Sequence, residues 1–159
     1  MDSLALPRVY ARNCLVRKLT KDEARAFFDA CHRLGFCACR HFYGLFISRR
    51  TGASEAALPQ GSLVAAAGFS SARNMSDKGG TARSFEWVRY ASLASCRVVG
   101  GMGKLLREFA REHKPGDIMT YVDAAENGGD SFAALGFALE GRVRDKSGEH
   151  ENLKFRKIF

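Results

Sequence analysis

The spacing of apolar residues after Gly101 predicts an amphipathic helix. Apolar side chains recur at the positions that form one buried helical face, and these residues are Met102, Leu105, Leu106, Phe109 and Ala110. Charged residues fall on the opposite side, and Lys114-Pro115-Gly116 ends the predicted helix.

A capping box predicts the start of an earlier helix. Thr20 and Glu23 have the spacing at which the hydroxyl caps the first turn and the carboxylate reaches back. An apolar face then continues to Leu34, and Gly35 suits the position just past the helix end. A further short helix is predicted over residues 131–137, after a loop that contains Asn127.

Seven segments have the composition or the alternation of β-strands. These segments are residues 14–19, 42–48, 63–71, 85–93, 118–123, 139–144 and 153–158. The last two flank a turn-forming stretch and are expected to form a hairpin. Residues 1–13 are expected to be a loose N-terminal arm.

Composition and charge narrow the class of protein. The chain has 159 residues, of which 46% are hydrophobic and 26% charged, as in ordinary globular domains. No apolar run could span a membrane and no signal-peptide pattern is present, so we expect a cytoplasmic protein without membrane association. The five cysteines fit reduced thiols. The cysteines and histidines between residues 31 and 41 lack the paired arms of a zinc site, so no metal is expected.

The net charge of +8 favours an anionic partner such as CoA or nucleic acid, although a basic chain can also owe its charge to solubility.

Glycines separate the predicted strand at 85–93 from the helix that follows Gly101. The first turn of a helix has unpaired N–H groups and the positive end of the dipole, and glycines let a phosphate approach these donors. Arg97 adds a positive charge at the mouth of this loop. The alternative is a tight turn that packs a helix against a sheet. The spacing matches neither a P-loop nor the G-x-G-x-x-G of dinucleotide folds.

Residues 97–106, Arg-Val-Val-Gly-Gly-Met-Gly-Lys-Leu-Leu, resemble the acyl-CoA loop of the GNAT superfamily of N-acetyltransferases, written Arg/Gln-x-x-Gly-x-Gly/Ala. The strand at 118–123 and the helix that ends in Leu135-Gly136-Phe137 resemble the next two elements of that superfamily. More narrowly, Val98-Val99-Gly100-Gly101, Tyr121-Val122-Asp123 and His32-Arg33-Leu34-Gly35 are similar to a phage-associated branch that includes the Mom DNA-modification proteins.

The resemblance implies an α/β fold, a GNAT-like single domain over residues 1–159. Its sheet would be mixed, mostly antiparallel and twisted, with six to seven strands and about four helices. The resemblance also implies acetyl-CoA or another acyl-CoA as the cofactor. The residues expected to bind it are Arg97, Val98, Val99, Gly100, Gly101, Gly103, Lys104 and Asn127. Asn127 would contact the cofactor arm or, as an alternative, cap the following helix.

Two residues depart from the superfamily pattern. Met102 stands where the loop usually has glycine or alanine, and its side chain would either crowd the pyrophosphate or point into the core. Phe132 stands where a tyrosine often protonates the CoA thiolate, and phenylalanine cannot donate a proton.

Three residues are candidates for the catalytic chemistry. Glu86 lies on the strand where many GNAT enzymes have a general base, and Asp123 ends a strand whose carboxyl edge is a common ligand site. Glu86 could equally pair with Arg89 or Arg73. His32 would lie at the substrate side of the fold by resemblance, or would simply be a helix-end histidine.

Three functions remain open. The first is acyl-CoA-dependent transfer from the thioester directly to an amine. The second is modification of a nucleic-acid base by a Mom-like enzyme that uses Asp123 and His32. The third is a non-catalytic GNAT-fold module that binds nucleic acid or protein, which Met102 and Phe132 favour.

Overall fold

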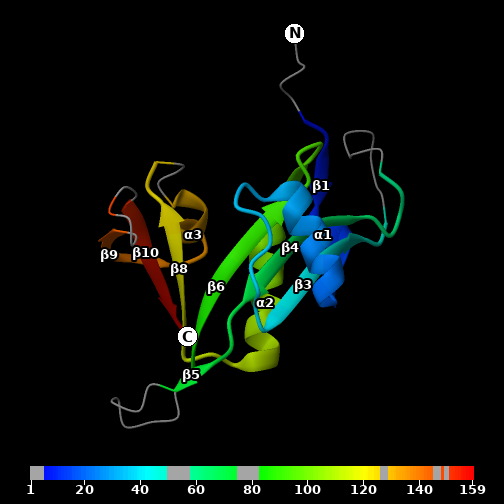
Figure 1. The fold of residues 1–159 in the computed structure, drawn as a ribbon. Coiled ribbons are helices and arrows are strands. Elements are labelled where there is room, and N and C mark those ends of the chain that lie inside the picture. The colour runs from blue at the N-terminus through cyan, green and yellow to red at the C-terminus, as the bar shows by residue number, and fades with distance from the viewer. Residues whose placement is uncertain (1–5, 50–57, 75–82, 126–128, 145–147, 149–150) are drawn as a thin grey trace. The chain divides into compact units, whose positions relative to one another are not determined.

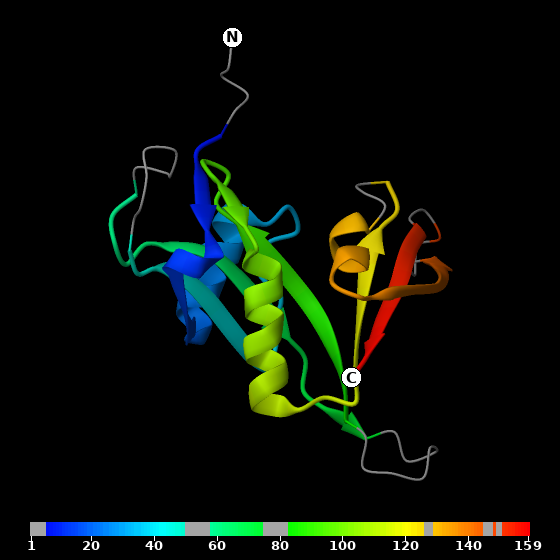
Figure 2. The same ribbon diagram turned by 180° about the vertical axis from the view of Figure 1, so that it is seen from behind.

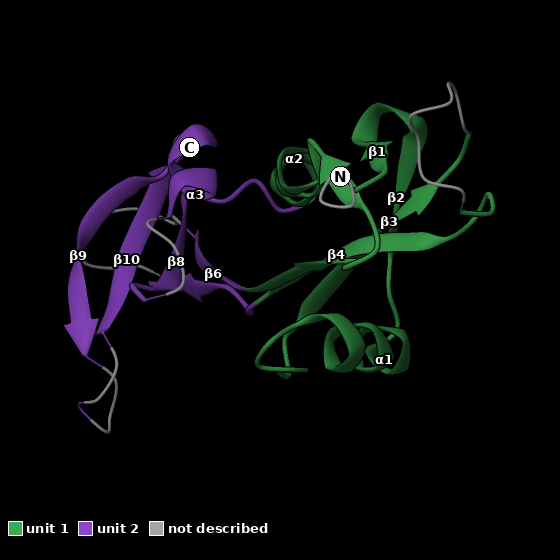
Figure 3. Cartoon of the chain, turned by 90° about the horizontal axis from the view of Figure 1, so that it is seen from above, with its two compact units in different colours: residues 1–69, 89–112 green, residues 70–88, 113–159 purple. Residues whose placement is uncertain are grey.

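The computed structural model describes residues 6–49, 58–74, 83–125, 129–144, 148 and 151–159. Two compact units divide the chain, one of residues 1–69 and 89–112, the other of residues 70–88 and 113–159 (Figure 3). The strand β6, Arg83–Ser92, contributes its first part to the second unit and its last part to the first. Whether residues 1–159 form one domain stays a prediction.

The first unit is a sheet with one helix on each face. Its elements besides the end of β6 are β1 (Arg8–Tyr10), the 3-10 turn η2 (Ala11–Asn13), β2 (Cys14–Lys18), α1 (Lys21–Cys31), β3 (His41–Ile47), β4 (Leu63–Phe69), β7 (Arg97–Val99) and α2 (Gly101–His113). The strands β2, β3 and β4 pair antiparallel in that order. Figure 1 shows α1 in front of these strands and Figure 2 shows α2 on the opposite face.

Successive side chains of β3 point to opposite faces of the sheet, so this strand contacts both α1 and α2. Phe42 packs against Phe28 of α1, with ring centroids 6.3 Å apart. The next residue, Tyr43, points to the other face and contacts Phe109 of α2 edge-on at 6.0 Å. Phe69 of β4 stacks on Phe109 at 3.9 Å. Burying these apolar faces holds both helices to the sheet.

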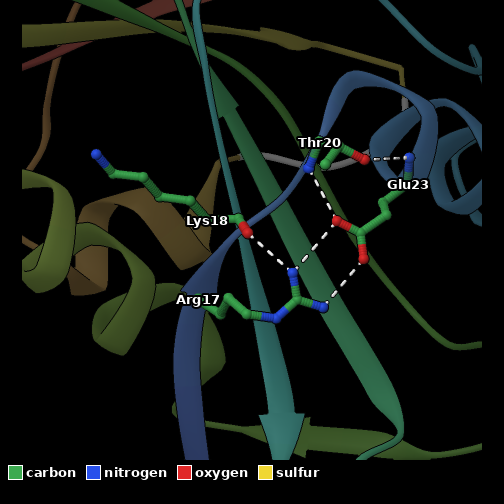
Figure 4. Close-up of polar contacts among 4 residues, drawn as sticks. All are labelled: Arg17, Lys18, Thr20 and Glu23. Carbon is green, nitrogen blue, oxygen red and sulfur yellow. Dashed lines mark hydrogen bonds and ion pairs between the residues drawn. The ribbon is translucent and has the colours of Figure 1, made fainter.

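Side chains from its own first turn close the N-terminus of α1 (Figure 4). The Glu23 amide donates to Thr20 Oγ1 at 3.1 Å, and Glu23 Oε1 accepts from the Thr20 amide at 2.9 Å. Arg17 holds both carboxylate oxygens of Glu23, at 3.2 and 3.0 Å. The hydrogen bonds from Arg17, and then the one from Thr20, lower the pKa of Glu23 to about 2. The predicted capping box is therefore confirmed.

The end of α1 differs from the prediction. The helix ends at Cys31 rather than Leu34, and the Leu34 side chain is 57% exposed. Gly35 has a left-handed φ of 73°, and its amide donates to the His32 carbonyl at 3.0 Å, which turns the chain. Residues 32–40 consequently form a loop. The described residues contain three α-helices, where about four were expected.

The second unit contains the start of β6, β5 (Arg73–Asn74), β8 (Asp117–Asp123), α3 (Asp130–Ala134), β9 (Ala138–Arg144) and β10 (Glu151–Ile158). β6 pairs parallel with β8, with Glu86 opposite Met119, and the order continues antiparallel through β10 to β9. An aromatic cluster fills this unit, where Phe132 of α3 meets Trp87 at 5.3 Å and Phe137 at 5.4 Å.

All seven predicted strands are present, and the mixed, mostly antiparallel pairing is confirmed. The N-terminal segment differs from the expected loose arm, because residues 8–13 form β1 and η2 and β1 pairs parallel with β7. None of the described helices is long and apolar enough to cross a membrane.

Candidate functional site

The glycine loop leads directly into the N-terminus of α2 in the first unit. Gly100 joins β7 to α2 with a left-handed φ of 80°, which glycine adopts without strain. The Gly100 carbonyl accepts the first helical hydrogen bond, from the Lys104 amide at 3.1 Å. The first turn of α2 contains no acidic residue. Its amide groups and the positive dipole end are thus without the carboxylate that serves α1.

Gly101 must be glycine for a reason of space. A Cβ at this position would lie 2.8 Å from Val98 Cγ1 and 3.0 Å from the Tyr90 hydroxyl oxygen. Gly101 and Gly103 are both buried, while Met102 between them is half-buried. The first turn of α2 therefore lies close against β6 and β7, and Met102 and Lys104 supply its large side chains.

Lys104 is bound to the chain itself. Its Nζ donates to the Ala11 carbonyl at 2.9 Å and to the Cys14 carbonyl at 2.6 Å. These bonds fasten η2 and the start of β2 to the first turn of α2. The prediction that Lys104 binds the cofactor stands beside these two bonds, which place its ammonium group at the same loop.

Arg97 lies at the entrance to this loop, with an exposed side chain on β7. Parallel pairing with β1 puts Arg8 directly opposite Arg97 and Val9 opposite Val98. Figure 2 shows β1 beside the chain segment that leads into α2. The seven loop residues expected to bind a cofactor thus lie together, with β1 as an additional neighbour. Asn127, the eighth, lies outside the described residues.

Tyr90 of β6 contacts this loop and was not among the predicted site residues. Its hydroxyl lies under Gly101, and burial, with a smaller effect of Cys96, raises its pKa to about 12. The phenol is therefore a neutral donor at physiological pH. The available signal was the alternation of β6, which places the Tyr90 side chain on the strand just before the glycine loop.

His32 caps the end of α1 in the first unit. Its Nδ1 accepts from the Leu34 amide at 3.0 Å, so the ring proton of the neutral form lies on Nε2. Burial, followed by the charges of Arg89 and Arg33, lowers its pKa. A neutral imidazole that presents Nε2–H can donate a hydrogen bond but cannot accept a proton there. The described contacts of His32 do not include the glycine loop.

Glu86 and Asp123 belong to the second unit. Glu86 is half-buried, and its backbone is fixed by two 2.8 Å hydrogen bonds with Ser70. Asp123 ends β8 and its Oδ1 accepts from the Ala125 amide at 2.9 Å. The pairing of Glu86 with Met119 puts both carboxylates on the same face. Asp123 is four residues further along β8, about 13 Å on an extended strand. The two carboxylates are therefore too far apart to share one proton.

Phe132 lies in the aromatic cluster of the second unit, where its ring packs against apolar neighbours. Phe132 is thus a packing residue of this unit. The five cysteines are free thiols. Among the described residues, no three His, Cys, Asp or Glu side chains come together as a metal site.

Comparison with known proteins identifies the fold. No family model and no curated protein matches the chain. Solved structures do match it. A chain of the NatB acetyltransferase complex, bound to CoA and MES, has a TM-score of 0.66 and 13% identity over 91% of this chain and 99% of its own.

Two further structures agree. NAA60 of Arabidopsis thaliana, in complex with acetyl-CoA, has a TM-score of 0.62 and 10% identity, with 92% of this chain and 98% of that chain covered. The ribosomal-protein-S18-alanine N-acetyltransferase of Escherichia coli has a TM-score of 0.61 and 12% identity, with 91% and 93% covered. The chain therefore has the GNAT acetyltransferase fold, as the loop residues predicted.

Proposed function

We propose that the protein is an acyl-CoA-dependent N-acyltransferase. The observation that carries this proposal is the N-terminus of α2, which has glycines at positions 100, 101 and 103, no acid in its first turn and Arg97 beside it. This arrangement suits a pyrophosphate, because the amide groups and the dipole both favour an anion. The loop lies in the fold of the acetyltransferases compared above, two of which are in complexes with CoA or acetyl-CoA.

Backbone amides of the Gly100–Gly103 turn bind the pyrophosphate, and Arg97 adds a charge-assisted hydrogen bond. Lys104 and Tyr90 support this turn from beneath. An amine nitrogen of the acceptor attacks the thioester carbonyl carbon; the C–N bond forms, the C–S bond breaks, and CoA leaves as the thiolate.

The amine proton passes to a carboxylate, either Glu86 or Asp123. His32 does not fit the role of base, since its Nδ1 already accepts from Leu34. Phe132 offers no proton to the leaving thiolate. A thiolate is a stable leaving group near neutral pH, so direct protonation contributes less than it would for an alkoxide.

Titration calorimetry tests the cofactor assignment. Acetyl-CoA is expected to bind, and S-acetylpantetheine, which lacks the pyrophosphate, is expected to bind far more weakly. Equal binding of the two, or no binding of acetyl-CoA at millimolar concentration, would sink the proposal. Release of the free CoA thiol is then measured with a panel of amines, and this assay on two variants identifies the base. If Glu86 is the base, Glu86→Gln loses turnover but retains acetyl-CoA affinity, and Asp123→Asn retains turnover and affinity. If Asp123 is the base, the two variants behave the other way round.

A Mom-like base-modifying enzyme is the second candidate, favoured by the net charge of +8 and by the phage-branch likeness of residues around His32 and Asp123. Its prediction is salt-dependent binding of DNA or RNA that competes with neither acetyl-CoA nor its analogue. The packing of Phe132 favours a third candidate, a non-catalytic binding module. A non-catalytic module would bind its ligand, but no amine in the panel would cause release of the CoA thiol.

A further inference from the structure

We infer that Arg8 binds the ribose 3′-phosphate of CoA, beside Arg97 at the pyrophosphate, and that this pair selects CoA over dephospho-CoA. The inference rests on the proposed function and adds to it a specificity residue outside the glycine loop. CoA carries its 3′-phosphate and its 5′-pyrophosphate on a single ribose. Two neighbouring guanidinium groups match two phosphate groups held a few bonds apart.

The pairing of β1 with β7 creates the juxtaposition. Arg8 is the register partner of Arg97, and the Arg97 amide donates to the Pro7 carbonyl at 2.8 Å. Register partners on neighbouring strands project their side chains to the same side. Val9 is buried with 4% of its surface exposed, whereas Arg8 and Arg97 are exposed. Both guanidinium groups therefore extend from the outer side of this two-stranded ladder.

The segment that carries Arg8 is fastened to the loop at further points. Lys104 bonds the carbonyls of Ala11 and Cys14, and Ala11 Cβ lies 3.6 Å from the position of a Cβ on Gly100. Residues 7–14 are thus hydrogen-bonded to the chain on both sides of the turn that is proposed to bind pyrophosphate, to Arg97 before it and to Lys104 after it. This anchoring sets Arg8 beside the turn before any ligand arrives, which lowers the ordering cost of binding.

The charges on this ladder are unbalanced. Like charges directly opposite on neighbouring strands destabilise a sheet. In the part of the chain that the structure describes, no carboxylate pairs with the guanidinium group of Arg8 or Arg97, whereas Arg17 pairs with Glu23 in the same unit. The Arg12 guanidinium lies 4.3 Å from the centre of the ring of Tyr10, which is two residues beyond Arg8 on β1. A dianionic phosphate between Arg8 and Arg97 would turn the repulsion into attraction.

The experiment compares two ligands on wild type and two variants. Wild type, Arg8→Gln and the control Lys21→Gln are titrated calorimetrically with CoA and with dephospho-CoA. Wild type is expected to bind CoA at least tenfold more tightly, as is typical of a charge-assisted hydrogen bond. Arg8→Gln is expected to lose this preference, because its affinity for CoA falls while that for dephospho-CoA is unchanged. Lys21→Gln, which removes one charge at the start of α1, should behave as wild type.

A second readout separates binding from a merely structural role. The melting temperature of ligand-free Arg8→Gln should equal or exceed that of wild type, because the repulsion with Arg97 is removed. A lower melting temperature, or equal losses for both ligands, would overturn the inference. The inference would also be overturned if Arg8→Gln lost binding to a single-stranded oligonucleotide but kept the preference for CoA over dephospho-CoA. If wild type binds neither ligand, the proposed function fails; if it binds both equally, the inference alone fails.

Discussion

The first turns of α1 and α2 lie in the same unit and leave the same kind of backbone amide groups unpaired, yet they treat them in opposite ways. At α1, Thr20 and Glu23 accept and return hydrogen bonds, and Arg17 fixes the carboxylate (Figure 4). At α2, three glycines lie at the start of the helix, at positions 100, 101 and 103, and the first turn has no acid. A first turn without an acidic residue lacks one source of electrostatic stabilisation. The proposed function places an anionic ligand at this helix start.

The difference between the two helix starts can be removed by giving α2 its own carboxylate. Gly100→Asp places a negative charge at the loop, and both Asp and Asn tolerate the left-handed φ of 80° better than other side chains. We expect acetyl-CoA affinity to fall by about a hundredfold or more, since the carboxylate repels the pyrophosphate and competes for its donors. Calorimetry measures the loss.

Gly100→Asn is the matched control, because it has the same shape and backbone demand without the charge. It should lose only a few-fold in affinity, and the Asp variant should be the more stable of the two without ligand, by about 0.3–1 kcal/mol. Equal affinities of the two variants would contradict an anion site at this turn.

A smaller loss is expected from Arg97, which supplies charge from the side of the loop. Arg97→Gln should weaken acetyl-CoA binding about 10- to 100-fold, the range for one charge-assisted hydrogen bond. Arg107→Gln on the exposed face of α2 is the control and should change affinity little. The idea fails if both substitutions act equally, because the effect would then be one of net charge.

Much of the fold could be predicted from local patterns. The capping box, the apolar face after Gly101 and the seven strands all depend on residues near one another in sequence. The same holds for the backbone of the glycine loop, where a strand, a turn and a helix follow in direct succession. These predictions succeed because the interactions that decide them span only a few residues.

The remainder depends on contacts between distant residues. Three-residue strands such as β1 and β7 have no pattern of their own, and each exists only because Arg8 to Tyr10 meets Arg97 to Val99. The hydrogen-bond partners of Lys104 lie about 90 residues away in the sequence, so no local pattern could predict these bonds. Likewise, the early end of α1 depends on Gly35 and on the neighbours of His32, such as Arg89, which bonds the Gly35 carbonyl at 3.1 Å.

The closed helix start should affect stability and not binding. Thr20→Ala removes the hydroxyl that accepts from the Glu23 amide and should lower the free energy of unfolding by about 1 kcal/mol. Thr20→Ser retains the hydroxyl and should cost much less. Urea denaturation measures both. Acetyl-CoA affinity should be unchanged in each variant, and a loss in Thr20→Ala would show that the two helix starts are coupled.

The smallest expected effect is a pH dependence confined to the closed start. The pKa of Glu23 is about 2 in the folded state, below its ordinary value of 4.5, chiefly because of Arg17. A carboxylate whose pKa is lowered by folding stabilises the folded state above its unfolded pKa, and this contribution is lost as pH falls from about 4.5 towards 2. Glu23→Gln keeps an oxygen for the Thr20 amide but does not titrate. The difference in urea midpoint between wild type and Glu23→Gln should therefore be constant near neutral pH and shrink through this acid range. A difference that persists unchanged at pH 2 would mean that Glu23 acts through its hydrogen-bonding shape, and the charge contrast between the two helix starts would then not hold.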